Sequence, residues 1–174
     1  MRLSILTFVA VSGLLLAPDA QAQYANRSLG IGAQATTSIN NAAQWALTIE
    51  GSVYLDSGFE LFLRIPVMIT HSPVGAATPS GSGQVFGTGG SLGARYLFLQ
   101  EQIRPWIGLQ LSTLVLFTQP LVTYYFGPGA TLGTDFFVTD FLSIGVRGTY
   151  DMFIDLNRPL RHNLGAGLNV TTVF

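Results

Sequence analysis

The chain of 174 residues has no cysteine, no lysine and little charge of either sign. Without cysteine it can have neither a disulfide scaffold nor a thiolate metal site. The absence of cysteine suits a protein of an oxidising compartment that is built without disulfides. Only 10% of its residues are charged, against roughly 25% in ordinary soluble domains. The formal net charge of −1 argues against a nucleic-acid-binding surface. Two distant histidines and no calcium-type cluster of Asp and Asn lead us to expect no metal and no cofactor.

Long apolar runs are also absent after residue 22, although the mean hydropathy of +0.43 is high. Met1-Arg2 is a short positive start, residues 3–16 are mostly apolar, and Ala20-Gln21-Ala22 has the pattern that signal peptidase accepts. An uncleaved membrane anchor is the alternative, but the run is shorter than the roughly 20 residues of a spanning helix. We therefore predict a signal peptide over 1–22 and one domain over 23–174.

What the chain has instead is a strict alternation of apolar residues with small or polar ones. At its end, every second residue from His162 to Phe174 can face lipid, and the residues between them are small or polar. Such alternation indicates a strand with one apolar and one polar face. The pattern recurs in eight segments, at about 28–36, 45–54, 59–69, 85–98, 105–117, 124–137, 141–153 and 162–174. The sequence therefore predicts an all-β fold, an eight-stranded antiparallel up-and-down transmembrane β-barrel.

The connections between these segments are predicted to alternate in length. The short, turn-like ones are 55–58, 99–103 and 138–140, and the mostly longer ones are 37–44, 70–84, 118–123 and 154–161. This asymmetry is typical of barrels in the cell outer membrane, with both chain ends on the periplasmic side. We expect that location and that orientation for this chain.

Aromatic residues fall near both expected rims of the barrel, and aromatic rings favour the membrane interface. Near the periplasmic rim lie Phe59, Tyr96, Phe98, Phe136 and Phe174, and near the outer rim lie Trp45, Phe86, Phe117, Tyr124 and Tyr150. A soluble β-sandwich with a buried aromatic core is the alternative. The expected signal peptide, the low charge and the terminal Phe174 disfavour it.

On these features the chain resembles the small eight-stranded outer-membrane barrels of Gram-negative bacteria, of the OmpA-domain, OmpX and OmpW types. In that family, alternating apolar residues before a C-terminal aromatic resemble the signal that the barrel-assembly machinery reads. Leu168, Val170 and Phe174 match this signal, whereas Thr172 stands where an aromatic is often found. The resemblance implies contact with outer-membrane lipid and lipopolysaccharide, with the assembly machinery during biogenesis, and with other envelope proteins.

Seven charged residues have inward parity, namely Glu50, Glu60, Arg64, Arg95, Asp135, Arg147 and Asp151. The turn near Ser57 brings Glu50 opposite Arg64, Glu60 shares a face with Arg64, and Arg147 shares one with Asp151. Because buried charges need partners, we predict an ion-pair network that plugs the lumen. A gate or a proton path is the functional alternative. An eight-stranded barrel has room only for its own side chains or one small ligand.

Nine glycines share this inward parity, namely Gly87, Gly89, Gly93, Gly127, Gly129, Gly133, Gly145, Gly165 and Gly167. They either leave a cavity or let large neighbours such as Trp106, Gln110 and Tyr125 fold across the lumen. We expect close packing, since glycine also permits sharp strand bending in small barrels. A cavity would instead allow a small apolar or amphipathic ligand.

No convincing catalytic dyad is present. A lipid-modifying enzyme needs a Ser or His with a carboxylate orienter. His162 has outward parity near the outer rim, but its neighbour on that face is Leu164, and the adjacent His71 and Ser72 would point oppositely. We expect a non-enzymatic barrel with a structural or interaction role, such as the outer-membrane anchor of an envelope-spanning complex for secretion, adhesion or motility. A narrow conduit or carrier for small hydrophobic molecules is the second hypothesis, and a lipid-modifying enzyme is the third.

Overall fold

The computed structural model describes residues 26–38, 43–55, 58–71, 85–99, 102–118, 121–155 and 158–174. The expected signal peptide over 1–22 lies outside these residues, as does most of the connection predicted at 70–84. In the described ranges, no helix is long and apolar enough to cross a membrane.

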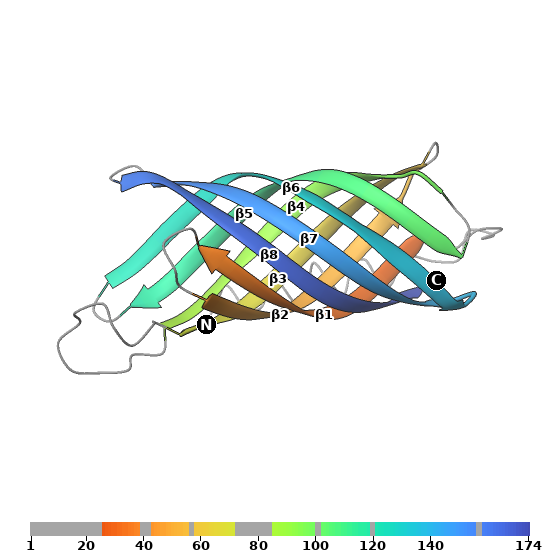
Figure 1. Cartoon of the computed structure of the whole chain (residues 1–174), viewed down its shortest axis with the longest axis horizontal. Helices are drawn as coiled ribbons and strands as arrows, with labels where there is room; N and C mark the ends of the chain where they lie inside the picture. The colour runs from red at the N-terminus through yellow and green to blue at the C-terminus, as the bar shows by residue number, and fades with distance from the viewer. Residues whose placement is uncertain are drawn as a thin grey trace, which may run out of the picture.

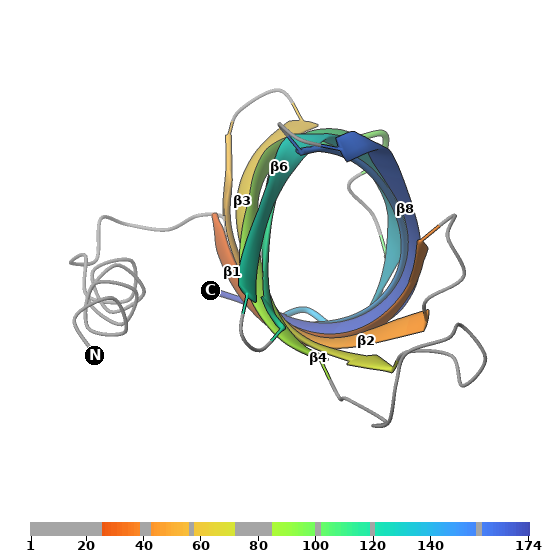
Figure 2. The same ribbon diagram turned by 90° about the vertical axis from the view of Figure 1, so that its left-hand side faces the viewer.

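Eight strands form one closed antiparallel barrel (Figure 1). They are β1 (Arg27–Ser38), β2 (Ala43–Tyr54), β3 (Phe59–His71), β4 (Val85–Leu97), β5 (Ile103–Thr118), β6 (Leu121–Thr139), β7 (Leu142–Asp155) and β8 (Arg158–Val173). Each strand pairs with its sequence neighbours, and β1 pairs with β8, so the sheet closes into a ring (Figure 2). The predicted all-β, eight-stranded antiparallel barrel is confirmed. Closure gives every strand two partners and removes the sheet edge.

The ring is staggered as well as closed. A path once around the barrel steps from each residue to its partner on the next strand. The path starts at Thr37 of β1, passes Leu164 of β8 and Leu109 of β5, and returns to β1 at Arg27, ten residues from its start. Such a stagger tilts all strands against the barrel axis. Because the sheet is rolled up, β2 and β7 can contact each other across the lumen although they are not neighbours in the sheet.

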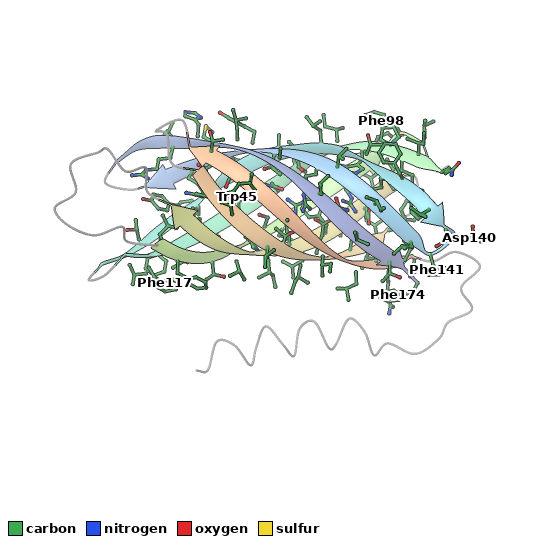
Figure 3. All side chains as sticks on the ribbon, turned by 60° about the horizontal axis from the view of Figure 1, so that its bottom comes forward. Trp45, Phe98, Phe117, Asp140, Phe141 and Phe174 are labelled. Atoms are coloured by element: carbon green, nitrogen blue, oxygen red, sulfur yellow. The ribbon has the colours of Figure 1, made fainter. Side chains whose placement is uncertain are left out.

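Alternation sorts the side chains between an apolar outer face and a polar inner face. Leu109 on β5 is 73% exposed, whereas the next residue, Gln110, is 5% exposed. An apolar exterior around a polar interior reverses the order of a soluble domain and is expected of a transmembrane barrel. Figure 3 shows side chains standing out from the wall, with Trp45 and Phe117 toward one end and Phe98 and Phe174 toward the other.

The turn between β2 and β3 depends on a glycine. Gly58 has a φ of 84°, a left-handed conformation in which a Cβ atom is strained. The Leu55 N–H donates to the Phe59 carbonyl at 2.7 Å and closes the turn. This turn sets the register of β2 against β3, and with it the positions of the charged residues on both strands.

At the opposite end of the barrel, here called the loop end, the strands continue further than the sequence indicated. Only residues 119–120 separate β5 from β6, and 156–157 separate β7 from β8, where loops at 118–123 and 154–161 were predicted. Leu114, Tyr125 and Phe153 lie next to this extension, within the predicted strands, and are buried on the inner face. The alternation with a polar interior therefore ends before the strands do. The connections at the loop end were expected to be longer than those at the other end, but only the connection over residues 72–84 is clearly longer.

Candidate functional site

Five buried charged side chains contact one another inside the barrel. We call this group the charge cluster; its members are Glu50, Glu60, Arg64, Arg95 and Arg147. Glu50 accepts hydrogen bonds from Arg64 Nε at 2.7 Å and from Arg147 Nη1 at 2.6 Å. It also accepts one from Arg95 Nη1 at 2.9 Å, and Arg95 Nε donates to Glu60 at 2.7 Å. All five residues are at most 8% exposed. These ion pairs are therefore made away from water, where a carboxylate depends on such donors.

The residues of the charge cluster are brought together in two ways: by the register of adjacent strands and by closure of the ring. Glu50 lies directly opposite Arg64 in the β2–β3 pair, as the sequence predicted, and Glu60 lies opposite Arg95 in the β3–β4 pair. Arg147 belongs to β7 and reaches Glu50 from a strand that is not adjacent to β2. Glu50 is therefore the point where a local hairpin contact and a contact across the lumen meet.

Asp135 and Asp151 lie on the inner face as expected, but the side chains that donate hydrogen bonds to them in the described residues are neutral. Asp135 accepts from the indole Nε1 of Trp106 at 3.0 Å and from the amide of Asn169 at 3.5 Å. Asp151 accepts from Gln110 Nε2 at 2.7 Å, and Gln110 Oε1 accepts from Arg64 Nη1 at 3.3 Å. Asp151 was predicted to belong to the ion-pair network, but it is joined to the charge cluster through the neutral amide of Gln110.

Two buried aromatic side chains, Phe62 and Trp106, support the arginines. The Arg95 guanidinium carbon lies 4.9 Å from the Trp106 ring and 5.7 Å from the Phe62 ring, and that of Arg64 lies 5.0 Å from Phe62. Each distance is within the range of a cation–π contact. The alternation pattern missed Phe62 because it expects polar residues inside. A glycine opposite each ring in the neighbouring strand could have indicated both rings, since Phe62 pairs with Gly93 and Trp106 with Gly133.

Several inward glycines are covered by neighbouring side chains, which is the close packing that the sequence predicted, whereas Gly89 and Gly127 lie against the backbone of the adjacent strand. A Cβ on Gly93 or Gly133 would lie 2.5 Å from a ring atom of Phe62 or Trp106. A Cβ on Gly165 would meet Gln34 at the same distance. A cavity of about 20 Å³ remains beside Arg64. That space suits a water molecule and excludes an organic ligand.

The predicted girdle residues all lie on the outer face and are exposed: Trp45, Phe59, Tyr96, Phe98, Phe117, Tyr124, Phe136, Tyr150 and Phe174. Phe59, Tyr96 and Phe98 form a string of edge-to-face contacts at the turn end, with ring centroids 5.1 and 5.4 Å apart. Their depth in a bilayer stays a prediction. Leu168 and Val170 of the expected assembly signal are exposed on β8, just before Phe174. Recognition of that signal also stays a prediction.

His162 lies on the outer wall beside Tyr150. Its Nδ1 is 2.6 Å from the Tyr150 hydroxyl, and the two rings are stacked with centroids 5.9 Å apart. Neither a serine nor a carboxylate is among the described partners of this pair. Within the described residues, no three side chains of His, Cys, Asp or Glu come together as a metal site.

Comparison with known proteins bears on the fold alone. No family model and no curated protein matches the chain. Neisserial surface protein A (NspA) superposes with a TM-score of 0.63 at 16% identity, over 87% of this chain and 98% of that one. The N-terminal β-barrel domain of Pseudomonas aeruginosa OprF gives 0.59 at 18% identity, over 84% and 97%.

The outer membrane enzyme PagL also matches, with a TM-score of 0.53 at 15% identity, over 82% of this chain and 97% of that one. Because an enzyme is among the matching structures, this fold does not decide whether the chain is a catalyst. The resemblance expected from the sequence is confirmed at the level of fold. The chain has the fold of the small eight-stranded outer-membrane barrels.

Proposed function

We propose that the chain is a non-enzymatic barrel of the bacterial outer membrane, with a closed lumen and a structural or interaction role. The convergence of Arg64, Arg95 and Arg147 on Glu50 carries this proposal. An ion that passed through the lumen would have to displace these hydrogen-bonded pairs in a space with little water. Side chains from β2, β3, β4 and β7 thus hold opposite walls together.

The proposed orientation places the chain ends in the periplasm. Arg27 and Phe174 are joined by two backbone hydrogen bonds, so the first strand begins and the last strand ends at the same end of the barrel, opposite the loop end. Lipid and lipopolysaccharide would surround the apolar wall, and the barrel-assembly machinery would insert it. Other envelope proteins would dock on the turns or loops if the barrel anchors a larger envelope-spanning complex.

The two other hypotheses have less support. A carrier for hydrophobic molecules needs an apolar cavity, but Phe62 and Trp106 occupy the space over Gly93 and Gly133. A lipid-modifying enzyme needs an activated nucleophile, and the described partner of the lipid-facing His162 is Tyr150.

Conductance across planar bilayers and swelling of liposomes test the proposal on refolded residues 23–174. We expect no steady current and no solute-driven swelling from the native chain. Arg104→Ala is the matched control, because Arg104 lies over Phe137 at the turn end and outside the charge cluster. A steady native current would contradict a closed lumen. If that current grew in Arg64→Ala and not in Arg104→Ala, the charge cluster would be a gate.

A further inference from the structure

The inner face of the barrel changes character between the charge cluster and the loop end. On β5, the inward residues run from Gln110 and Ser112 to Leu114. On β7, they run from Arg147 through Asp151 to Phe153. Both strands run toward the loop end, so on β5 and β7 apolar side chains lie between the charge cluster and the loops, whereas the buried Thr36 and Gln44 of β1 and β2 are polar.

These apolar side chains pack together, and we call Ala46, Leu114, Tyr125 and Phe153 the apolar seal. The four residues come from β2, β5, β6 and β7, and each is at most 5% exposed. The ring centroids of Tyr125 and Phe153 are 6.2 Å apart. The Arg161 guanidinium carbon lies 5.2 Å from the Tyr125 ring. Since these side chains face the lumen and not the lipid, they are buried against one another inside the barrel and away from water.

A cavity of about 20 Å³, with both polar and apolar residues in its wall, lies between the charge cluster and the apolar seal. Its wall includes Arg64, Ser112, Asp151 and Asn163, and Phe153 of the seal. Arg64 is 2% exposed, and its Nη2 has no hydrogen-bond partner among the described residues. A buried N–H group without an acceptor is costly, so this atom calls for a further ligand.

The size and charge of the cavity restrict that ligand. A space of roughly 10–15 Å³ already admits a water molecule, whereas a larger solute needs much more. Arg64 is already paired with Glu50, and the carboxylate of Asp151 lies on the same wall, which disfavours a free anion. Arg64 in turn disfavours a cation. A neutral molecule that accepts from a guanidinium and donates to an oxygen fits both sides.

We propose that this cavity is a binding site for a buried water molecule held by Arg64 Nη2, and that the apolar seal separates it from the outside solution. The inference rests on the proposed closed lumen and adds a second barrier to it. The charge cluster stops ions in the middle of the barrel, and the apolar seal stops solvent exchange at the loop end. Opening the seal alone should therefore expose the water site without making the barrel conduct.

Cysteine accessibility tests the seal, because the native chain has no cysteine. Ser112→Cys places a thiol on the cavity wall, and Asp140→Cys gives an exposed reference at a turn. The rate of modification by a small, positively charged methanethiosulfonate is measured in detergent micelles, where the reagent reaches both ends of the barrel. We expect Ser112→Cys to react at least about 100-fold more slowly than Asp140→Cys. Equal rates would overturn the proposal.

Two further substitutions, each combined with Ser112→Cys, test whether the seal is the barrier to the reagent. Phe153→Ala opens the seal, and Phe126→Ala removes the same ring from the outer wall of β6, where residue 126 pairs with residue 154 of β7. We expect the Ser112→Cys rate to rise at least about tenfold with Phe153→Ala and to stay unchanged with Phe126→Ala. Leu114→Ala takes the place of Phe153→Ala if the latter does not refold. An unchanged rate in a folded seal variant would overturn the proposal.

Conductance separates this inference from the proposed function. Phe153→Ala should remain silent in bilayers, because the charge cluster is intact. A current from Phe153→Ala would place the main barrier at the seal, and the inference of two separate barriers would be wrong. In the native chain, water–protein NOESY spectra should show contact between the Arg64 guanidinium protons and a long-lived water. No such contact in a folded native sample would remove the water site.

Discussion

Glu50→Gln should lower the free energy of unfolding by about 3–5 kcal/mol, the usual cost of removing one partner from a buried ion pair. The side chain keeps its size but loses its charge, and three arginines contact it. Arg95 still pairs with Glu60, whereas the ion pairs of Arg64 and Arg147 are both made with Glu50. Two guanidinium groups would then lie in the lumen without a carboxylate.

Urea unfolding in lipid vesicles measures this loss. The two tryptophans report on different places, because Trp45 lies on the outer wall and Trp106 lies inside beside Asp135. The unfolding midpoint and slope of each variant give its free energy of unfolding. Asp140→Asn is the control, since it removes a carboxylate at an exposed turn and should change stability by less than about 0.5 kcal/mol.

A loss below about 1 kcal/mol for Glu50→Gln would refute the reasoning, because it falls in the range of exposed pairs and would mean that water reaches the arginines. A double variant sharpens the test. If unpaired arginine causes the loss, Arg147→Met should restore part of the stability of Glu50→Gln. Strictly additive losses would show that the two side chains do not interact.

Three further substitutions follow from the geometry. Leu109→Arg puts a charge on the lipid face and should cost about 2–4 kcal/mol in urea unfolding. Gly93→Ala pushes a methyl group against the Leu109 carbonyl oxygen and the Phe62 ring and should cost about 1–3 kcal/mol. Gly148→Ala, whose nearest neighbour would be 3.8 Å away, should leave the thermal midpoint unchanged. Arg64→Ala removes one of three donors to Glu50 and should cost about 1.5–3 kcal/mol in guanidinium unfolding. Unchanged midpoints for Leu109→Arg and Arg64→Ala would contradict the assignment of the two faces.

Much of the fold could be predicted because the two faces of a barrel strand follow the parity of the sequence. Glu50, Arg95 and Arg147 were assigned to the lumen on parity alone, and all three are buried there. The hairpin register also follows from a local signal, the turn that ends at Gly58. Both inferences concern one strand or two adjacent strands.

Contacts across the lumen could not be predicted in the same way. The pairing of Arg147 with Glu50 depends on the number of strands and on the stagger of the ring, which no short segment encodes. Asp151 was assigned to the lumen, but its neutral partners Gln110 and Ser112 come from another strand. The seal residues Leu114 and Phe153 were missed because apolar residues on the inner face do not fit the alternating pattern.

Closure of the ring also determines at which stage of folding Arg147 can pair with Glu50. Arg147 and Glu50 are 97 residues apart in the sequence, and β1 meets β8 only when the two ends of the chain come together. Such long-range contacts form slowly, because chain entropy is lost before the contacts return any free energy. An open, half-inserted sheet would hold Arg147 unpaired at the level of the lipid, which is strongly unfavourable. The chain should therefore insert and close in one concerted step, and an open sheet should not accumulate in the membrane.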